Sequence, residues 1–147
     1  MESVKWAGEV GAVMAMALSA AGSMLGVHVA GMATLGAWKK CYVENRPAPF
    51  LLISFVSAPL SQSIYGLIVM NALLGAAATH EPLARLGFGC LSGAVIGGSA
   101  WLQGRLGALA ADAMSSTGKG FGQFLMVLGV IETVALFMMV FVVRILG

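Results

Sequence analysis

Charged residues are scarce in this sequence. Only 10% of its 147 residues are Asp, Glu, Lys or Arg, 59% are hydrophobic, and the mean hydropathy is +0.93. A soluble domain carries roughly 25% charged and about 45–50% apolar residues, so this chain cannot cover a water-facing surface. Intrinsic disorder is excluded as well, because it requires low hydrophobicity and high charge. The composition predicts an integral membrane protein, with room for about four spanning helices and no catalytic domain outside the membrane.

Cysteine and net charge are also low. Cys41 and Cys90 are far apart and form no Cys-x-x-Cys pair, so a redox or zinc site lacks support. The net charge of +2, from eight basic and six acidic residues, is too small and too scattered for a nucleic-acid surface. We therefore expect the lipid bilayer, and no nucleic acid, as a partner.

Islands of charged residues and proline divide the chain into four apolar stretches, at about residues 10–38, 50–78, 86–111 and 121–145. Each is long enough to cross a bilayer with some tilt. All four should be helices, because backbone polar groups in hydrocarbon must be paired within the element and no period-two alternation suggests a barrel. The first stretch is too long for a signal-peptide core, so we expect it to be retained. The predicted fold is an all-α membrane protein of two tandem helical hairpins, residues 1–79 and 80–147.

Basic residues are unevenly distributed among the loops. The loops after the first and third stretches hold Lys39, Lys40, Arg46 and Lys119, the loop after the second holds only Arg85, and the terminal regions carry Lys5 and Arg144. By the positive-inside tendency, the loops after the first and third helices are expected to be cytoplasmic and both termini outside.

An internal repeat relates the two halves of the chain. Ser23–Val27 lines up with Ser99–Gln103 at an offset of 76, and Ser61 falls on Thr133 at an offset of 72. This pattern predicts two fused hairpins in the same orientation. The second half then has Glu132 where the first has Leu60, so the halves differ at their most polar position.

Small residues are concentrated in the first and third stretches, many of them four residues apart, whereas the bulky aromatic residues lie mainly in the second and fourth. Small residues on one helix face allow close backbone approach in lipid. The pattern favours a tight inner layer formed by the first and third helices and an outer layer formed by the other two. A compact four-helix monomer with glycines at ordinary crossings remains an alternative.

Glu132 is the residue that most strongly indicates a function. It lies 11 residues after Phe121 and 12 before Arg144, near the middle of the fourth stretch. An ionisable group at that depth costs roughly 2.5–3.5 kcal/mol on insertion scales and is a functional candidate by default. The alternative is a structural, protonated Glu bonded to a neighbouring helix.

Other stretches supply polar partners for this carboxylate. Ser61, Gln62 and Tyr65 are close enough in register to share one side of a helix. Pro59 lacks an N–H and leaves carbonyl groups free in the preceding turn, and Gln103 adds another mid-span amide. Together with the carboxylate these groups give about five hard oxygen donors, which suit a dehydrated hard cation such as Na⁺. A proton, the alternative ion, would need only the acid and an apolar wall.

These residues make the sequence resemble the membrane-ring proteolipid of V-type ATPases in its prokaryotic, sodium-type double-hairpin form, the K subunit of those complexes. The resemblance covers essentially the whole chain. Its most specific pieces are Pro59–Gly66, Gln103–Arg105 and Val130–Thr133.

The resemblance implies Na⁺ ligands at the Ala58 carbonyl, the Ser61 hydroxyl, Gln62, Gln103 and Glu132, with Tyr65 donating a hydrogen bond to Glu132. Sodium-type members look like Leu-Pro-Gly-Thr-Gln-Gly-Ile-Tyr-Gly in the second span. This chain has Ser61 in place of the Thr, and Leu60 and Ser63 in place of glycines. Serine keeps the hydroxyl, so the departures affect local helix packing more than ion chemistry.

The resemblance also implies a mechanism. An ionised, empty Glu132 could not face lipid, whereas a site with Na⁺ bound is neutral and can travel through the bilayer. A homo-oligomeric ring would turn against a stator membrane subunit whose arginine displaces the ion. A central-stalk subunit on the cytoplasmic side would couple this rotation to ATP hydrolysis elsewhere. The chain would be a non-catalytic subunit in a prokaryotic plasma membrane, carrying one ion per four-helix unit because Leu60 replaces a second acid.

Two other classes are alternatives. A small four-span proton-coupled exporter would place its acid in the first span, where this chain has only Glu9 near the end. A membrane redox or lipid-modifying enzyme would need a cysteine pair or a clustered nucleophile and base, and neither pattern is found.

Two further polar residues lie within the spans. A metal or proton-relay role for His28 would need a second ligand four residues on, where Met32 stands, so we expect a neutral packing histidine. Arg105 is expected to extend toward the cytoplasmic end of its helix.

Overall fold

The computed structural model describes residues 2–147. Met1 and the side chains of Glu2, Ser3 and Lys5 lie outside the described part, and so does the contribution of Lys5 to the predicted charge bias. The elements are α1 (Glu2–Val43), η1 (Phe50–Leu52), α2 (Ile53–Ser57), η2 (Ala58–Leu60), α3 (Ser61–Gly75), η3 (Ala76–Ala78), α4 (Pro82–Thr117) and α5 (Phe121–Leu146).

Within the described residues, four segments are long and apolar enough to cross a membrane: Trp6–Val43, Phe50–Ala78, Pro82–Thr117 and Phe121–Leu146. The predicted all-α fold with four spans is therefore confirmed. The helices extend past the predicted stretches, most of all in α1, because a helix can continue beyond the hydrocarbon layer of about 30 Å.

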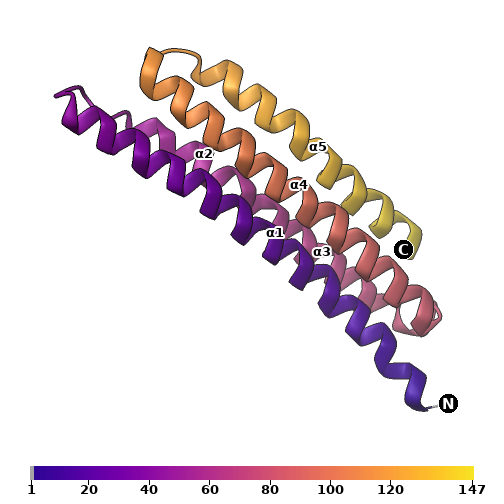
Figure 1. The fold of residues 1–147 in the computed structure, drawn as a ribbon. Coiled ribbons are helices and arrows are strands. Elements are labelled where there is room, and N and C mark those ends of the chain that lie inside the picture. Colours follow the sequence, from indigo (N-terminus) through magenta and orange to yellow (C-terminus); the bar gives the residue numbers. More distant parts are fainter. Residues whose placement is uncertain (1) are drawn as a thin grey trace.

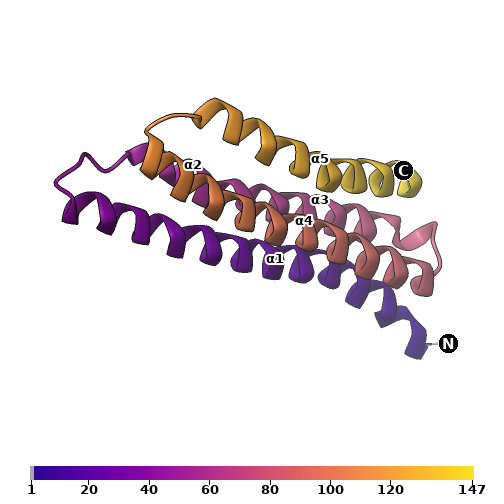
Figure 2. The same cartoon turned by 45° about the horizontal axis from the view of Figure 1, so that its top comes forward.

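The helices lie side by side in an elongated bundle (Figures 1 and 2). α1 and α4 lie along each other, α3 packs against both, and α5 packs on α4 and α3. The N-terminal end of α1 extends past the other helices (Figure 2).

Glycines bring α1 and α4 into backbone contact. A Cβ added at Gly22 would overlap the backbone of Gly97, and one added at Gly104 would overlap the backbone of Gly26. Near the other end, a Cβ at Gly89 would overlap Gly11. These pairs show that α1 and α4 run in the same direction and confirm the predicted close packing of the first and third helices.

The predicted loop position of Arg85 is wrong. Arg85 lies in the first turn of α4 and is buried, because the helix already begins at Pro82. Proline favours the first helical position, where a missing N–H costs nothing. The Arg85 guanidinium Nε donates a 2.8 Å hydrogen bond to the carbonyl oxygen of Leu73, a residue near the end of α3. Arg85 therefore joins two helices and does not count toward the charge of a loop.

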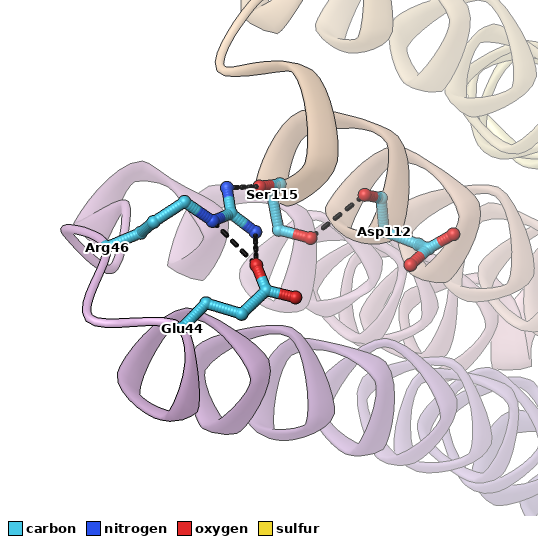
Figure 3. A network of polar contacts seen from close by, with 4 residues as sticks. All are labelled: Glu44, Arg46, Asp112 and Ser115. Carbon is cyan, nitrogen blue, oxygen red and sulfur yellow. Dashed lines mark hydrogen bonds and ion pairs between the residues drawn. The ribbon is translucent and has the colours of Figure 1, made fainter.

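The turn after α1 is fastened to the end of α4 (Figure 3). Arg46 donates from Nη1 to the Ser115 carbonyl oxygen at 3.0 Å and from Nε to Glu44 Oε2 at 2.7 Å. The Ser115 hydroxyl donates in turn to the carbonyl oxygen of Asp112 at 2.9 Å. Carbonyls in the last turn of a helix lack a partner further along that helix, and Arg46 supplies one. The turns after α1 and α4 therefore lie at the same end of the bundle.

Candidate functional site

The second span is broken where the site begins. α2 passes through the short 3₁₀ segment η2, which contains Pro59, before α3 starts at Ser61. Proline has no N–H, so the carbonyl of Phe55, four residues earlier, loses its helical donor. That carbonyl faces α4 at Gly107, where a Cβ would lie 2.8 Å from the oxygen. The break therefore occurs against a glycine that leaves room for it.

The Ser61 hydroxyl lies between two oxygen acceptors. It is 3.1 Å from the carbonyl oxygen of Ala58 and 3.1 Å from Oε1 of Gln62. A hydroxyl has one proton to donate, so it can bond only one of these oxygens at a time. Three oxygen atoms thus converge at the start of α3.

Two buried glutamines connect α3 to α4. Gln62 and Gln103 are fully buried, and Gln62 Nε2 donates to Gln103 Oε1 at 2.8 Å. Gln103 Nε2 donates to the carbonyl oxygen of Leu128 at 3.0 Å and lies 3.4 Å from Glu132 Oε2. Buried amides require such partners, because an unpaired polar group costs about 1–3 kcal/mol.

Glu132 is half-buried on α5 and faces both partner helices. The Tyr65 hydroxyl donates to Glu132 Oε1 at 2.7 Å, while the Gln103 amide lies beside Oε2. Both carboxylate oxygens therefore face donors, so Tyr65 and Gln103 hold the acid from two sides.

The structure brings all the predicted site residues together. A continuous series of polar contacts links them from η2 across α3 and α4 to α5; we call this set the Glu132 cluster, and it comprises Ala58, Ser61, Gln62, Tyr65, Gln103 and Glu132. The cluster offers two neutral amides, a hydroxyl, a phenol, a backbone carbonyl and one carboxylate. Chemically it can hold a single small cation or a proton, each of which neutralises the lone acid.

Sequence reasoning missed two supporting groups. The Ser99 hydroxyl donates to the carbonyl oxygen of Ile131 at 2.9 Å, directly before Glu132, and the Leu128 carbonyl accepts from Gln103. Ser99 stands four residues before Gln103, and Leu128 stands four before Glu132. This helical spacing was the available signal.

The equivalent position in the first half of the chain is apolar. Leu60 stands 72 residues before Glu132, and Val27 stands 76 before Gln103, the two offsets of the internal repeat. Leu60 is 51% exposed, and neither Leu60 nor Val27 can supply the carboxylate or the amide of their counterparts in the second half. Only the second half contributes a carboxylate at this depth.

His28, which we expected to be a neutral packing histidine, is exposed on α1 in the single chain and has no packing partner inside the described part of the bundle. In a membrane span both the interior and the lipid-facing surface are apolar, so the residues around His28 give no amphipathic pattern from which to infer its face.

Residues 86–145, which include almost all of α4 and α5, match the model of a protein family described as the ATP synthase C subunit. The matched segment contains Gln103 and Glu132 and covers less than half of the chain. No curated protein sequence matches the chain.

Proposed function

We propose that the chain is a rotor-ring proteolipid of a V-type ATPase. In this proposal each copy binds one Na⁺ at Glu132 and carries it past a stator subunit while the ring rotates, and ATP is hydrolysed elsewhere in the complex. The chain itself is non-catalytic. The observation that carries the proposal is the Glu132 cluster, a mid-membrane acid with buried amides and a hydroxyl beside it.

The match of residues 86–145 to the family of the ATP synthase C subunit supports a rotor proteolipid. The apolar counterpart of the site in the first half, at Leu60, supports a double-hairpin form with one ion per chain. The V-type assignment rests on that fused arrangement together with the resemblance of residues 59–66.

Na⁺ is favoured over a proton because of the number of oxygen atoms. The proposed ligands are the Ala58 carbonyl, the Ser61 hydroxyl, the amide oxygens of Gln62 and Gln103, and the Glu132 carboxylate. A proton on Glu132 would need none of the first four, whereas an alkali-metal ion that has lost its water needs several hard oxygens. The Gln62 oxygen has the Ser61 hydroxyl as its neighbour, and that hydroxyl can turn its proton away from an arriving cation.

Charge determines when the ring can turn. With Na⁺ bound the cluster is neutral, so it can pass along the lipid. When the ion leaves, Glu132 carries a negative charge that costs several kcal/mol in hydrocarbon. An arginine of the stator would meet that charge and hold it until the next ion enters, so rotation and ion transfer occur together.

The proposed orientation places the turns after α1 and α4 on the cytoplasmic side, where a central-stalk subunit would meet them, and both termini outside. Lys39, Lys40, Arg46 and Lys119 lie toward that end of the bundle, in agreement with the positive-inside tendency. We place the complex in a prokaryotic plasma membrane.

A carbodiimide reagent tests this proposal, because it modifies protonated carboxyl groups in apolar surroundings. We expect modification of Glu132 in the purified protein, complete protection by Na⁺, and no protection by K⁺ at the same concentration. Glu44, an exposed acid that is paired with Arg46, serves as the internal control, and Na⁺ should not alter its low labelling. Labelling of Glu132 that ignores Na⁺ would instead indicate a proton-carrying ring. A particle no larger than a dimer would indicate an exporter.

A further inference from the structure

Two polar side chains on the inner helices lie at membrane depth without a hydrogen-bonding partner in the described part of the chain. His28 on α1 and Arg105 on α4 are both exposed. The Arg105 guanidinium lies 5.4 Å from the ring centre of Trp101, a cation–π contact that leaves its N–H donors unused. Arg105 is only two residues beyond Gln103, which is level with the mid-membrane acid. A charge at that depth is costly unless it is paired.

His28 and Arg105 stand at the same depth. The glycine contacts between α1 and α4 pair Gly11 with Gly89, Gly22 with Gly97 and Gly26 with Gly104. These pairs correspond to register offsets of 78, 75 and 78 residues. Arg105 follows His28 by 77 residues, within the same range. In a ring of parallel copies every α1 has the same depth, so His28 of each copy is level with Arg105 of its neighbours.

Both side chains lie away from the contact between α1 and α4 inside one chain. His28 is two residues past Gly26, about 200° further round α1, and Arg105 is about 100° past Gly104 on α4. A hollow of about 370 Å³ crosses this open face of α4; it is lined by Val29, Leu102, Arg105, Leu106, Leu109 and Ile131. In the proposed ring, a helix of the neighbouring copy would cover this face.

The internal repeat identifies that helix. At the offset of 76, Gly98 and Leu102 on the open face of α4 correspond to Gly22 and Gly26, the residues of α1 that touch α4. A Cβ at Gly98 would meet nothing within 4 Å, so this face is uncovered in the single chain. By the same offset His28 corresponds to Gly104. Inside the chain, Gly26 of α1 contacts Gly104 of α4. When each residue is replaced by its repeat equivalent, the same contact between copies places Leu102 of α4 against His28 of the neighbouring α1.

We infer that Arg105 of one copy donates a hydrogen bond to the His28 imidazole of the adjacent copy, at a head-to-tail junction between α4 and α1. This inference rests on the proposed rotor ring and specifies how its copies meet. A neutral imidazole has one ring nitrogen that accepts, and a guanidinium has five N–H donors. The contact joins α4 of one copy to α1 of the next, so it is heterologous, and its head-to-tail repetition builds a closed ring.

A double-substitution series tests the pair through the thermal midpoint at which the detergent-purified ring separates into monomers. His28→Leu leaves the Arg105 charge unpaired, so we expect a lower midpoint or loss of assembly. Adding Arg105→Leu removes the charge as well, and the midpoint should recover toward the wild-type value, because removing both partners costs less than removing one. His28→Gln, which keeps an acceptor, should also assemble normally. Met32→Leu, on the same exposed face of α1, is the matched control and should change nothing.

A midpoint that is unchanged in His28→Leu, or lower in the double variant than in His28→Leu, overturns the inference. A second measurement uses His28→Cys with Arg105→Cys after replacement of Cys41 and Cys90 by alanine. A short bifunctional thiol reagent should then produce a ladder of cross-linked oligomers. Ala17→Cys with Arg105→Cys is the control pair, because Ala17 lies on the same face about 16 Å away along α1, and it should give no ladder.

The outcomes separate the two proposals. If the particles are ring-sized and Na⁺ protects Glu132, but His28→Cys with Arg105→Cys gives no ladder, the junction is refuted and the rotor assignment stands. Particles that are not ring-sized refute both.

Discussion

The side-chain amides of the two buried glutamines, Gln62 and Gln103, are oriented in the same direction. Gln62 donates to Gln103, and Gln103 donates toward Glu132, so the amide N–H groups of both side chains point to the acid side of the cluster. The oxygen of Gln62 faces the opposite way, toward the Ser61 hydroxyl. This polarity keeps oxygen atoms at the α3 end and donors beside the carboxylate. In the proposed site the cation would lie between these oxygens and the Glu132 carboxylate, which Tyr65 holds in position from its other side.

Tyr65→Phe tests the role of the phenol in holding the acid. It removes the 2.7 Å hydrogen bond to Glu132 without removing a proposed ligand. Hydrogen bonds to charged groups are worth about 1.5–3 kcal/mol, so Na⁺ should protect Glu132 from carbodiimide with at least about tenfold lower apparent affinity. Tyr42→Phe, at an exposed tyrosine near the end of α1, is the control and should leave the affinity unchanged. Equal affinities in the two variants would show that Tyr65 does not position the carboxylate.

The polar residues of the cluster could be predicted from the sequence because a mid-span Glu, Gln or Tyr stands out against apolar neighbours. Ser99 could not be found in the same way, because serine is common in membrane helices and bonds to backbone as readily as to a site. Its spacing of four residues places Ser99 on the same side of α4 as Gln103, but its partner, the Ile131 carbonyl, is identified only when α4 and α5 lie side by side. The correct spans alone were not enough to identify it.

At the scale of helices, α1 and α4 form one closely packed pair. Their glycines allow backbone-to-backbone contact at Gly22 with Gly97 and at Gly26 with Gly104. The broken second span packs against this pair and places Ser61 and Gln62 beside Gln103. A shift of α1 relative to α4 would therefore disturb the packing beneath the site.

Gly22→Ala tests this packing. The added Cβ would meet backbone atoms of Gly97, which cannot move aside as a flexible side chain could. Overpacking of this kind costs about 1–3 kcal/mol, so the thermal unfolding midpoint of the protein in detergent should fall. Gly129→Ala on α5, where the new methyl group meets nothing within 4 Å, is the matched control and should leave the midpoint unchanged or slightly raised. An unchanged midpoint in Gly22→Ala would mean that α1 and α4 can separate freely.

Element types could be predicted from the sequence with more success than element faces. Hydropathy and proline positions identified four helices and the break at Pro59, because the requirement for paired backbone groups in lipid allows few alternatives. The sequence predicts the start of α4 too late, with Arg85 in a loop, because the charge of Arg85 masks the helix-start signal of Pro82. The face of α1 on which His28 lies could not be predicted, because lipid-facing and interior residues have the same polarity in a span.

At the scale of the whole molecule, one chain leaves much of its apolar surface uncovered. Val130, Phe137 and Phe141 on α5 are all more than half exposed, and the open face of α4 carries a polar residue at mid-membrane depth. Lipid can cover the outer face of α5. In the inferred junction, the adjacent copy would supply the partner of Arg105, and assembly would place the Glu132 clusters at one depth around the proposed ring.

The most direct test of the central claim is equilibrium binding of radioactive Na⁺ to the purified, assembled protein. We predict saturation at one Na⁺ per chain, no competition by K⁺, and complete loss of binding in Glu132→Gln, while that variant still assembles to the same particle size. Saturable Na⁺ binding that persists in an assembled Glu132→Gln protein, or its absence from the wild-type protein, would contradict the account.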